Sequence, residues 1–270
     1  MRASGTLGLI GAALLAVGDF GVGGSPQREL AAAMRSYEAG NPSELLVTLG
    51  DNDYTESPAT FARNWRATFG WLRPAGLGVA GVLGNHDVRV RGGRYQLSLL
   101  GMPSRYYSRR VGDVQLLALD SNRVDAAQTA WLRRVLSAAT DARWRIAVFH
   151  HPAYTCGVYR GARAVRRAWV PLFERHGVHL VLSAHDHNYQ RFAPRRGVTY
   201  VVHGGGNPRL YPLGSCPAGY PRRVAGRAER GFLHVAVEEG RLVGRAVTLG
   251  GRAVDNFVVT HPAAGGVQEP

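Results

Sequence analysis

Short apolar runs that each end in a polar cluster constrain the fold of this chain more than any other feature of its sequence. The runs have the length of buried β-strands, and they cover residues 12–17, 45–49, 79–83, 114–119, 146–149, 178–182 and 198–202. Stretches with a helical spacing of apolar residues lie between them, at 27–39, 59–69, 126–138 and 162–176. Alternating strands and helices are typical of a layered α/β fold, which places functional side chains at the carboxyl ends of its strands.

Length and composition indicate the domain organisation. With 270 residues the chain is long enough for one large domain and too short for two ordinary domains joined by a linker. Hydrophobic residues make up 45% of it and charged residues 19%, a composition that excludes an intrinsically disordered protein. Segments 232–237 and 241–248 alternate like half-exposed antiparallel strands. We therefore expect a single domain at 1–262, followed by a Gly/Pro-rich tail at 263–270.

The N-terminal region holds Arg2 and an apolar run at 7–17 that could be mistaken for the hydrophobic part of a signal peptide. We expect no cleavage there, because cleavage would remove the strand that leads to Asp19. No apolar stretch reaches the ~18 residues expected of a membrane span. We therefore expect a soluble protein with no membrane span and no clear cleavable signal peptide.

The two cysteines, Cys156 and Cys216, both lie in loops that are rich in glycine and proline. They lack the Cys-x-x-Cys spacing of zinc or thioredoxin-like sites. A disulfide that ties two surface loops together and a pair of free thiols both fit this pattern. A disulfide would favour an exported protein over an intracellular one, and the compartment stays open.

Five polar clusters follow apolar runs directly, so each is predicted at the carboxyl end of a strand. They are Gly18-Asp19-Phe20-Gly21, Gly50-Asp51-Asn52-Asp53-Tyr54, Gly84-Asn85-His86-Asp87, His150-His151-Pro152 and His185-Asp186-His187. The third is the most specific, because an amide, an imidazole and a carboxylate in succession would each need a buried partner in a core. An aspartate after a strand is also a common helix cap, so the first cluster alone is a weak signal.

The spacing of the histidines adds a signal for metal binding. Residues two apart in extended chain share a face, so His185 and His187 can both approach one metal centre. Adjacent residues point to opposite sides, so only one of His150 and His151 is expected to face the site. In combination, the five clusters predict a metal site at the ends of the strands.

These motifs resemble those of the calcineurin-like metallophosphoesterase superfamily over residues 10 to 205. The Gly50-Asp51-x-x-Tyr54 spacing further resembles its purple acid phosphatase branch, the small tartrate-resistant type in particular. The resemblance implies a four-layer α/β/β/α sandwich and a dinuclear metal-dependent hydrolase of phosphate monoesters. It implies that one ion, usually ferric, is held by Asp19, Tyr54 and His187, and that Asp51 bridges both ions. The second ion, typically zinc, manganese or ferrous iron, would be held by Asn85, His150 and His185.

The resemblance also implies catalytic roles. A hydroxide held by the metal ions would attack phosphorus, His86 would act as the general acid, and Asp87 would orient His86. The histidines with which other branches bind substrate have no clear counterpart, so His151 and His203 are candidates for substrate contacts, and a satisfied strand-end residue is the simpler interpretation of His203. Ala184 stands where the family usually has glycine before the His-x-His pair, and it adds a methyl group beside the site.

The formal net charge is +14, and all 33 basic residues are arginines. Codon bias accounts for such a surface without any function, whereas a positive field also attracts phosphate esters or nucleic acid. We expect a phosphorylated small molecule as the substrate, with nucleic acid less favoured. Two alternatives stay open: a metal-dependent phosphodiesterase or nuclease on the same fold, and a catalytically silent, arginine-rich nucleic-acid-binding protein.

Overall fold

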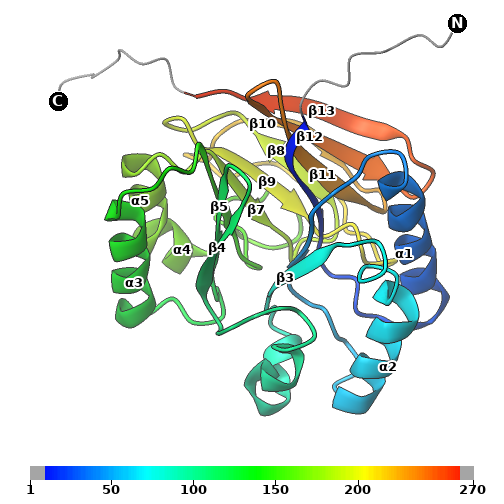
Figure 1. Ribbon diagram of the computed structural model, residues 1–270. Helices are drawn as coiled ribbons and strands as arrows, with labels where there is room; N and C mark the ends of the chain where they lie inside the picture. Colours follow the sequence, from blue (N-terminus) through cyan, green and yellow to red (C-terminus); the bar gives the residue numbers. More distant parts are fainter. Residues whose placement is uncertain (1–9, 262–270) are drawn as a thin grey trace, which may run out of the picture.

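Two β-sheets face each other between helices in the computed structural model, which describes residues 10–261 (Figure 1). The first sheet contains, in spatial order, β13 (Ala253–Val259), β12 (Arg241–Thr248), β11 (Gly231–Glu238), β1 (Ile10–Val17), β2 (Leu45–Leu49) and β3 (Gly78–Val82). The second contains β10 (Arg223–Arg227), β8 (Tyr189–Phe192), β9 (Thr199–His203), β7 (Leu180–Ser183), β6 (Trp144–Val148), β5 (Val114–Ala118) and β4 (Tyr107–Val111). The tail expected at 263–270 lies outside the described residues.

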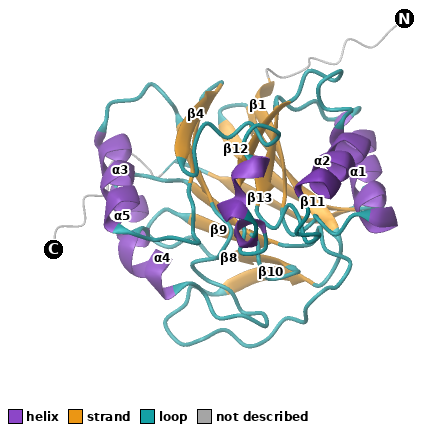
Figure 2. Ribbon diagram, turned by 90° about the horizontal axis from the view of Figure 1, so that it is seen from below, coloured by secondary structure: helices purple, strands orange, loops and turns teal. Residues whose placement is uncertain are grey.

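Helices lie on the outer side of each sheet, as both ribbon views show (Figures 1 and 2). The first sheet is covered by α1 (Gly24–Glu38) and α2 (Pro58–Phe69), and the second by α3 (Ala126–Ser137), α4 (Arg163–Ala168) and α5 (Val170–Arg175). Two short 3-10 helices, η1 (Asp87–Arg89) and η2 (Arg91–Gln96), follow β3. Within residues 10–261, no helix combines the length and the apolar character needed to cross a membrane.

Two hydrophobic cores separate the layers. Leu116 of β5 belongs to a core that fills the space between the sheets and continues through the first sheet to its helices, since it also includes Leu14 of β1 and Leu30 of α1. Leu117 is the next residue and points to the opposite face of its strand, where it joins a second core with Trp169. The order of the layers is therefore α/β/β/α, which confirms the expected sandwich.

Parallel strands bring the polar clusters together. β1, β2 and β3 run parallel to one another, and so do β5, β6, β7 and β9. The turns that follow these strands consequently lie at the carboxyl edges of the two sheets. The five clusters follow β1, β2, β3, β6 and β7, so the topology places them at this common edge.

The helix expected at 162–176 is divided into α4 and α5, which corrects the prediction. The break falls at Trp169, whose φ and ψ of −110° and −35° depart from regular helical values. Pro171 explains the break, because proline has no N–H for the helical hydrogen bond to Arg167 and its ring crowds that residue's carbonyl.

The strands expected to be half-exposed near the C-terminus are buried. Every residue of β11 except Glu238 is buried, since β11 pairs with β1 on one side and β12 on the other. On its outer face, the ring of Tyr37 from α1 lies 5.4 Å from the ring of Phe232 and 5.5 Å from that of His234. A helix therefore covers the face that sequence alternation assigned to solvent.

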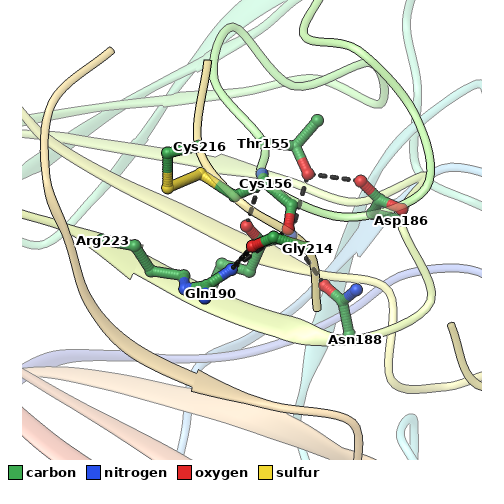
Figure 3. The surroundings of a disulfide bond; sticks show 8 residues. All are labelled: Thr155, Cys156, Asp186, Asn188, Gln190, Gly214, Cys216 and Arg223. Carbon is green, nitrogen blue, oxygen red and sulfur yellow. Dashed lines mark hydrogen bonds between the residues drawn. A yellow bond between two sulfur atoms is a disulfide. The ribbon is translucent and has the colours of Figure 1, made fainter. Parts of the chain in front are cut away.

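Cys156 and Cys216 are joined by a disulfide bond, so the structure adopts the first of the two alternatives left open by the sequence (Figure 3).

Candidate metal centre

Left-handed turns present three of the predicted ligands. Asp19, Asp51 and His185 have backbone φ angles of 61°, 51° and 71°. Residues with a Cβ atom seldom adopt this conformation, which costs on the order of 1–3 kcal/mol at each position and persists only where the surrounding structure enforces it. One such constraint is the hydrogen bond of 2.9 Å from the Asp19 N–H to the Gly50 carbonyl. Three of the seven non-glycine residues with a positive φ in the described part of the chain are thus predicted ligands.

The first group of predicted ligands converges on the Tyr54 hydroxyl. Its oxygen lies 3.3 Å from Asp19 Oδ1 and 3.2 Å from Asp51 Oδ2. It also lies 3.2 Å from Nε2 of His187, and that nitrogen is 3.4 Å from Asp19 Oδ1. The structure thus brings together the residues expected to hold one ion.

The second group converges on Nε2 of His150. This nitrogen lies 3.1 Å from Asn85 Oδ1 and 3.1 Å from His185 Nδ1. It also lies 3.5 Å from Asp51 Oδ2, the same oxygen that contacts Tyr54. Asp51 therefore stands between the two groups, at the position of a bridging ligand.

Backbone carbonyls determine which histidine nitrogens face the site. Nδ1 of His150 lies 3.0 Å from the Leu49 carbonyl oxygen, and Nδ1 of His187 lies 2.8 Å from that of Arg209. Because a carbonyl oxygen only accepts, each Nδ1 carries a proton, and Nε2 presents a lone pair whenever the ring is neutral. Against the effect of burial, the hydrogen bond to Asp19 raises the pKa of His187. Burial lowers the pKa of His150 well below its usual value, which keeps that ring neutral.

Acceptor atoms in the centre consequently outnumber the protons that they could share. The neutral His150 ring, the Asn85 carbonyl oxygen and the Asp51 carboxylate direct lone pairs at one another. Oxygen and nitrogen ligand atoms of Asp19, Asp51 and His150 all lie within 4.8 Å of one another. A cation among these atoms would replace mutual repulsion by attraction, so the donor set fits metal ions.

The other oxygen of each carboxylate is held by a backbone amide. The N–H of His86 donates to Asp51 Oδ1 at 2.9 Å, and the N–H of His185 donates to Asp19 Oδ2 at 2.9 Å. Gly84 leaves the space for this contact, because a Cβ atom there would lie 2.1 Å from Asp51 Oδ1. The carboxylates are therefore oriented before any ion binds.

Burial also shifts the pKa values of an aspartate, a histidine and the tyrosine among the predicted ligands. It raises the pKa of Asp19 to about 7 and lowers the pKa of His185 to about 2. Burial raises the pKa of Tyr54 far above its ordinary value, and the negative charges of Asp19 and Asp51 raise it further. Only a strongly Lewis-acidic ion would hold Tyr54 as a phenolate in these surroundings.

His86 and Asp87 occupy different surroundings. The half-buried ring of His86 lines the cavity, and its centroid lies 4.3 Å from that of Tyr54; burial lowers its pKa. The Asp87 carboxylate is buried and accepts hydrogen bonds from the Gly84 N–H at 2.7 Å and from Gln96 at 2.8 Å. Within residues 10–261, the Asp87 carboxylate makes no hydrogen bond to the His86 ring. Its bonds to Gly84 and Gln96 instead fix the turn that carries His86.

His151 also lies at the site, although strand alternation predicted that only one of the two adjacent histidines would. Its ring centroid is 4.6 Å from that of His185, and its Nδ1 is 3.0 Å from Ser121 Oγ. The alternation does not apply, because β6 ends at Val148 and the chain bends at His150 and His151.

His203 does not contribute to the surface of the site. Only 2% of its surface is exposed, and its ring packs against that of Tyr189 with 5.8 Å between centroids. Burial leaves no open face for a substrate, which agrees with a strand-end residue packed within the fold. The expected satisfied histidine is not found, because Nδ1 of His203 has no hydrogen-bond partner among the described residues.

A cavity of about 310 Å³ lies over the predicted ligands and has walls that sequence reasoning missed. The missed residues are Val22, Tyr159, Asn207, Arg209 and Tyr211. Tyr159 stacks on the His185 ring and Tyr211 on the His187 ring, each with 4.2 Å between centroids. Residues 207–211 follow a strand and three glycines, which is the same signal that marked the five clusters.

Comparisons with known proteins show the family and the fold. The family model described as calcineurin-like phosphoesterase matches residues 12–189. Tartrate-resistant acid phosphatase type 5 of Mus musculus is 31% identical over 119 residues, which are 42% of this chain and 36% of the mouse protein. The Homo sapiens protein of the same name is 26% identical over 132 residues, which are 47% of this chain and 40% of the human one. The chain thus spans about a third of the length of the curated relatives it matches.

Solved structures share the fold. GAP50, described as the anchor in the inner membrane complex of Plasmodium, superposes with a TM-score of 0.77 and 18% identity, over 94% of this chain and 90% of that one. The purple acid phosphatase PPD1 from yellow lupin (Lupinus luteus) seeds gives a TM-score of 0.76 and 14% identity, over 92% of this chain and 53% of that one. At these identities the similarity concerns the fold alone.

Proposed function

We propose that this chain, which belongs to the calcineurin-like phosphoesterase family, holds two metal ions and hydrolyses phosphate monoesters. The observation that carries the proposal is the position of Asp51 Oδ2, which lies 3.2 Å from the Tyr54 hydroxyl and 3.5 Å from Nε2 of His150. One carboxylate oxygen thereby joins the two sets of predicted ligand atoms.

The residues of each set would hold one ion. Asp19, Tyr54 and His187 offer two anionic oxygens and an imidazole, a set suited to ferric iron, while Asn85, His150 and His185 offer a neutral oxygen and two imidazoles, a set suited to zinc, manganese or ferrous iron. Two bound ions would supply Lewis acidity toward the phosphate and a nucleophilic water at moderate pH.

His86 is the proposed general acid. It lines the cavity beside Tyr54, and its backbone N–H is fixed by Asp51. A proton on the His86 ring would pass to the departing alkoxide as the bond from phosphorus to oxygen breaks. Because burial lowers the pKa of His86, the protonated ring prevails only at acidic pH, which supports an acid phosphatase. His151 lies beside His185 and is the remaining candidate for a contact with the substrate.

Metal analysis together with paired substrates tests the proposal. Purified protein loaded with iron and zinc should contain two ions per chain and hydrolyse p-nitrophenyl phosphate faster than bis-p-nitrophenyl phosphate. Asp51→Asn should lose metal and activity together, because it weakens the one ligand common to both ions. Asp113→Asn is the matched control, since Asp113 is 61% exposed and pairs with Arg110.

Three results would contradict the proposal. Preference for the bis-ester would indicate a phosphodiesterase, and a single bound ion would remove the dinuclear site. Salt-dependent binding of DNA by a protein that holds no metal and turns over neither ester would indicate an arginine-rich binding protein.

A further inference from the structure

An exposed aromatic residue stands at the mouth of the proposed catalytic cavity. Tyr159 is 39% exposed and its neighbour Val158 is 56% exposed, which makes them two of only three large hydrophobic residues exposed within residues 10–261. Tyr159 stacks on the His185 ring at 4.2 Å and meets Tyr211 edge to face at 5.8 Å. A large apolar side chain at a cavity mouth is a frequent mark of ligand contact.

A second pocket, of about 670 Å³, shares Tyr159 with the catalytic cavity. Its wall includes three arginines, Arg160, Arg163 and Arg166, and no acidic residue. Arg166 donates to the Ala153 carbonyl at 2.8 Å, whereas Arg160 and Arg163 are exposed and form no ion pair with any described residue. The pocket therefore carries two arginines, Arg160 and Arg163, whose charges no ion pair with a described residue neutralises, while the buried Asp186 carboxylate beneath the loop bonds to Thr155 and to backbone amides.

The loop that carries these residues is fixed. The Asp186 carboxylate, between the two ligands of the His-x-His pair, accepts hydrogen bonds from Thr155 and from the Val158 N–H, the latter at 3.1 Å. On the other side, the Cys156 N–H donates to Gln190 at 2.7 Å, and Cys156 is bonded to Cys216 (Figure 3). A fixed loop holds Tyr159 in place without the entropic cost of ordering it on binding.

We propose that this loop selects the leaving group of the substrate: the enzyme prefers phosphate monoesters whose alcohol carries an aromatic ring and further negative charge. The inference rests on the proposed phosphomonoesterase function. With the phosphate at the metal centre, the aromatic ring contacts Tyr159 at the cavity mouth, and the additional anionic groups lie against Arg160 and Arg163 in the second pocket.

Matched phosphotyrosyl peptides test the charge preference, because they share one leaving group. One peptide has glutamates on both sides of the phosphotyrosine, and the other has glutamines. The wild-type protein should show the higher kcat/KM on the glutamate peptide. Arg160→Gln/Arg163→Gln should reduce the ratio of the two kcat/KM values roughly three- to tenfold, the effect of losing two exposed charge contacts.

Arg133→Gln/Arg134→Gln is the control for net charge, because it removes two exposed arginines from α3 on the outer side of the second sheet. This control should leave the ratio unchanged. Equal kcat/KM values of the wild-type protein on the two peptides would overturn the inference and leave the proposed function intact. The same reduction of the ratio in both double variants would do so too. A protein that hydrolyses neither peptide nor p-nitrophenyl phosphate would overturn the proposed function and the inference with it.

A second measurement tests the aromatic contact. Tyr159→Leu should lower the ratio of kcat/KM for phosphotyrosine peptide to that for phosphoserine peptide, and metal content, determined in parallel, should stay at the wild-type level. Comparing ratios between proteins cancels the different reactivity of the two leaving groups. An unchanged ratio in a fully metallated variant would remove Tyr159 from the proposal.

Discussion

Tyr54 has one phenolic proton and three acceptors within 3.3 Å of its oxygen. Burial and two carboxylates raise the pKa of Tyr54 and keep that proton in place. Loss of the proton would therefore indicate that a strongly Lewis-acidic ion is bound to the phenol oxygen. Iron-loaded protein should therefore show a visible charge-transfer band from the phenolate. Tyr54→Phe should abolish the band, and Tyr211→Phe should keep it. A band that survives in iron-loaded Tyr54→Phe would show that another residue binds the ferric ion.

His86 gives a prediction that depends on the leaving group. An alkyl phosphate needs protonation of the departing oxygen, whereas a nitrophenolate leaves without it. His86→Ala should therefore lose a factor of ~10²–10⁴ on an alkyl phosphate and much less on p-nitrophenyl phosphate. Metal content should remain normal. Equal losses on both esters, or loss of the ions, would make His86 a binding residue or a ligand.

Ala184, the departure from the glycine usual in the family, is accommodated by the glycine opposite. A Cβ atom on Gly18 would lie 2.3 Å from the Ala184 Cβ atom, so the two positions cannot both carry a methyl group. Gly18→Ala should destabilise the protein by about 1–3 kcal/mol through overpacking. Ala184→Gly in the same chain should restore part of this loss, because contacts of 3.1 Å with Leu49 and 3.2 Å with His203 remain. Denaturant unfolding of the single and double variants would measure the coupling, and strict additivity would contradict it.

The sequence predicted which residues meet at the site better than it predicted the site's walls. Predicted ligands such as Asn85 could be picked out because a run of an amide, an imidazole and a carboxylate at a strand end has few structural uses. Tyr159 could not be found in this way, since a tyrosine in a loop carries no spacing rule, whereas Tyr211 belongs to the segment 207–211 that follows a strand and three glycines and could have been marked by that signal. His203 shows the limit of the same rule, because a histidine at a strand end can also be packed inside the fold.

Among the secondary-structure elements, β11 contains a buried group with no partner. His234 is 4% exposed, and neither of its ring nitrogens has a hydrogen-bond partner. Burial lowers its pKa from 6.5 to about 4. The unfolded chain therefore takes up a proton first, and this histidine reduces stability progressively as pH falls from about 6.5 to about 4.

Replacement of His234 should remove that pH dependence. His234→Leu should raise the free energy of unfolding at neutral pH, because no unpartnered nitrogen is left buried. The gain should increase by on the order of 2–3 kcal/mol between pH 7 and pH 4. Urea unfolding of metal-free wild type and variant at both pH values would measure the difference. A gain that is the same at the two values would show that His234 does not titrate during unfolding.

The strands that sequence reasoning missed are interrupted by polar or exposed residues. β4, β10 and β13 form edges of their sheets, and their exposed residues interrupt the apolar run that marks a buried strand. β8 lies inside its sheet, yet Gln190 in its middle points polar atoms at the loop of Cys156. The parallel strands were predictable because both of their faces are buried.

At the scale of the whole molecule, each proposed ion connects the two sheets. For one ion, Asp19 and Tyr54 follow strands of the first sheet and His187 follows a strand of the second. For the other, Asn85 follows a strand of the first sheet and His150 follows a strand of the second. Metal ions would therefore act as links between the layers. Chelation of both ions should lower Tm by roughly 10–20 °C for free metal at about a hundred times its Kd.

Calorimetry with and without chelator would measure this shift. Asp51→Asn, which weakens both ion sites, should already unfold near the temperature of the chelated wild type and respond little to further chelator. Equal Tm values for the metallated and metal-free wild type would show that the ions do not stabilise the contact between the sheets.

The division of the ligands between early and late strands has a consequence for synthesis. On the ribosome, the residues around Tyr54 emerge long before His187, and β1 receives its second neighbour only when β11 has been made. A nascent chain thus exposes carboxylates and single histidines that cannot yet assemble a complete centre. The proposed centre would then be complete only after most of the chain has been made, so the ions available where folding ends would decide which metals the protein binds.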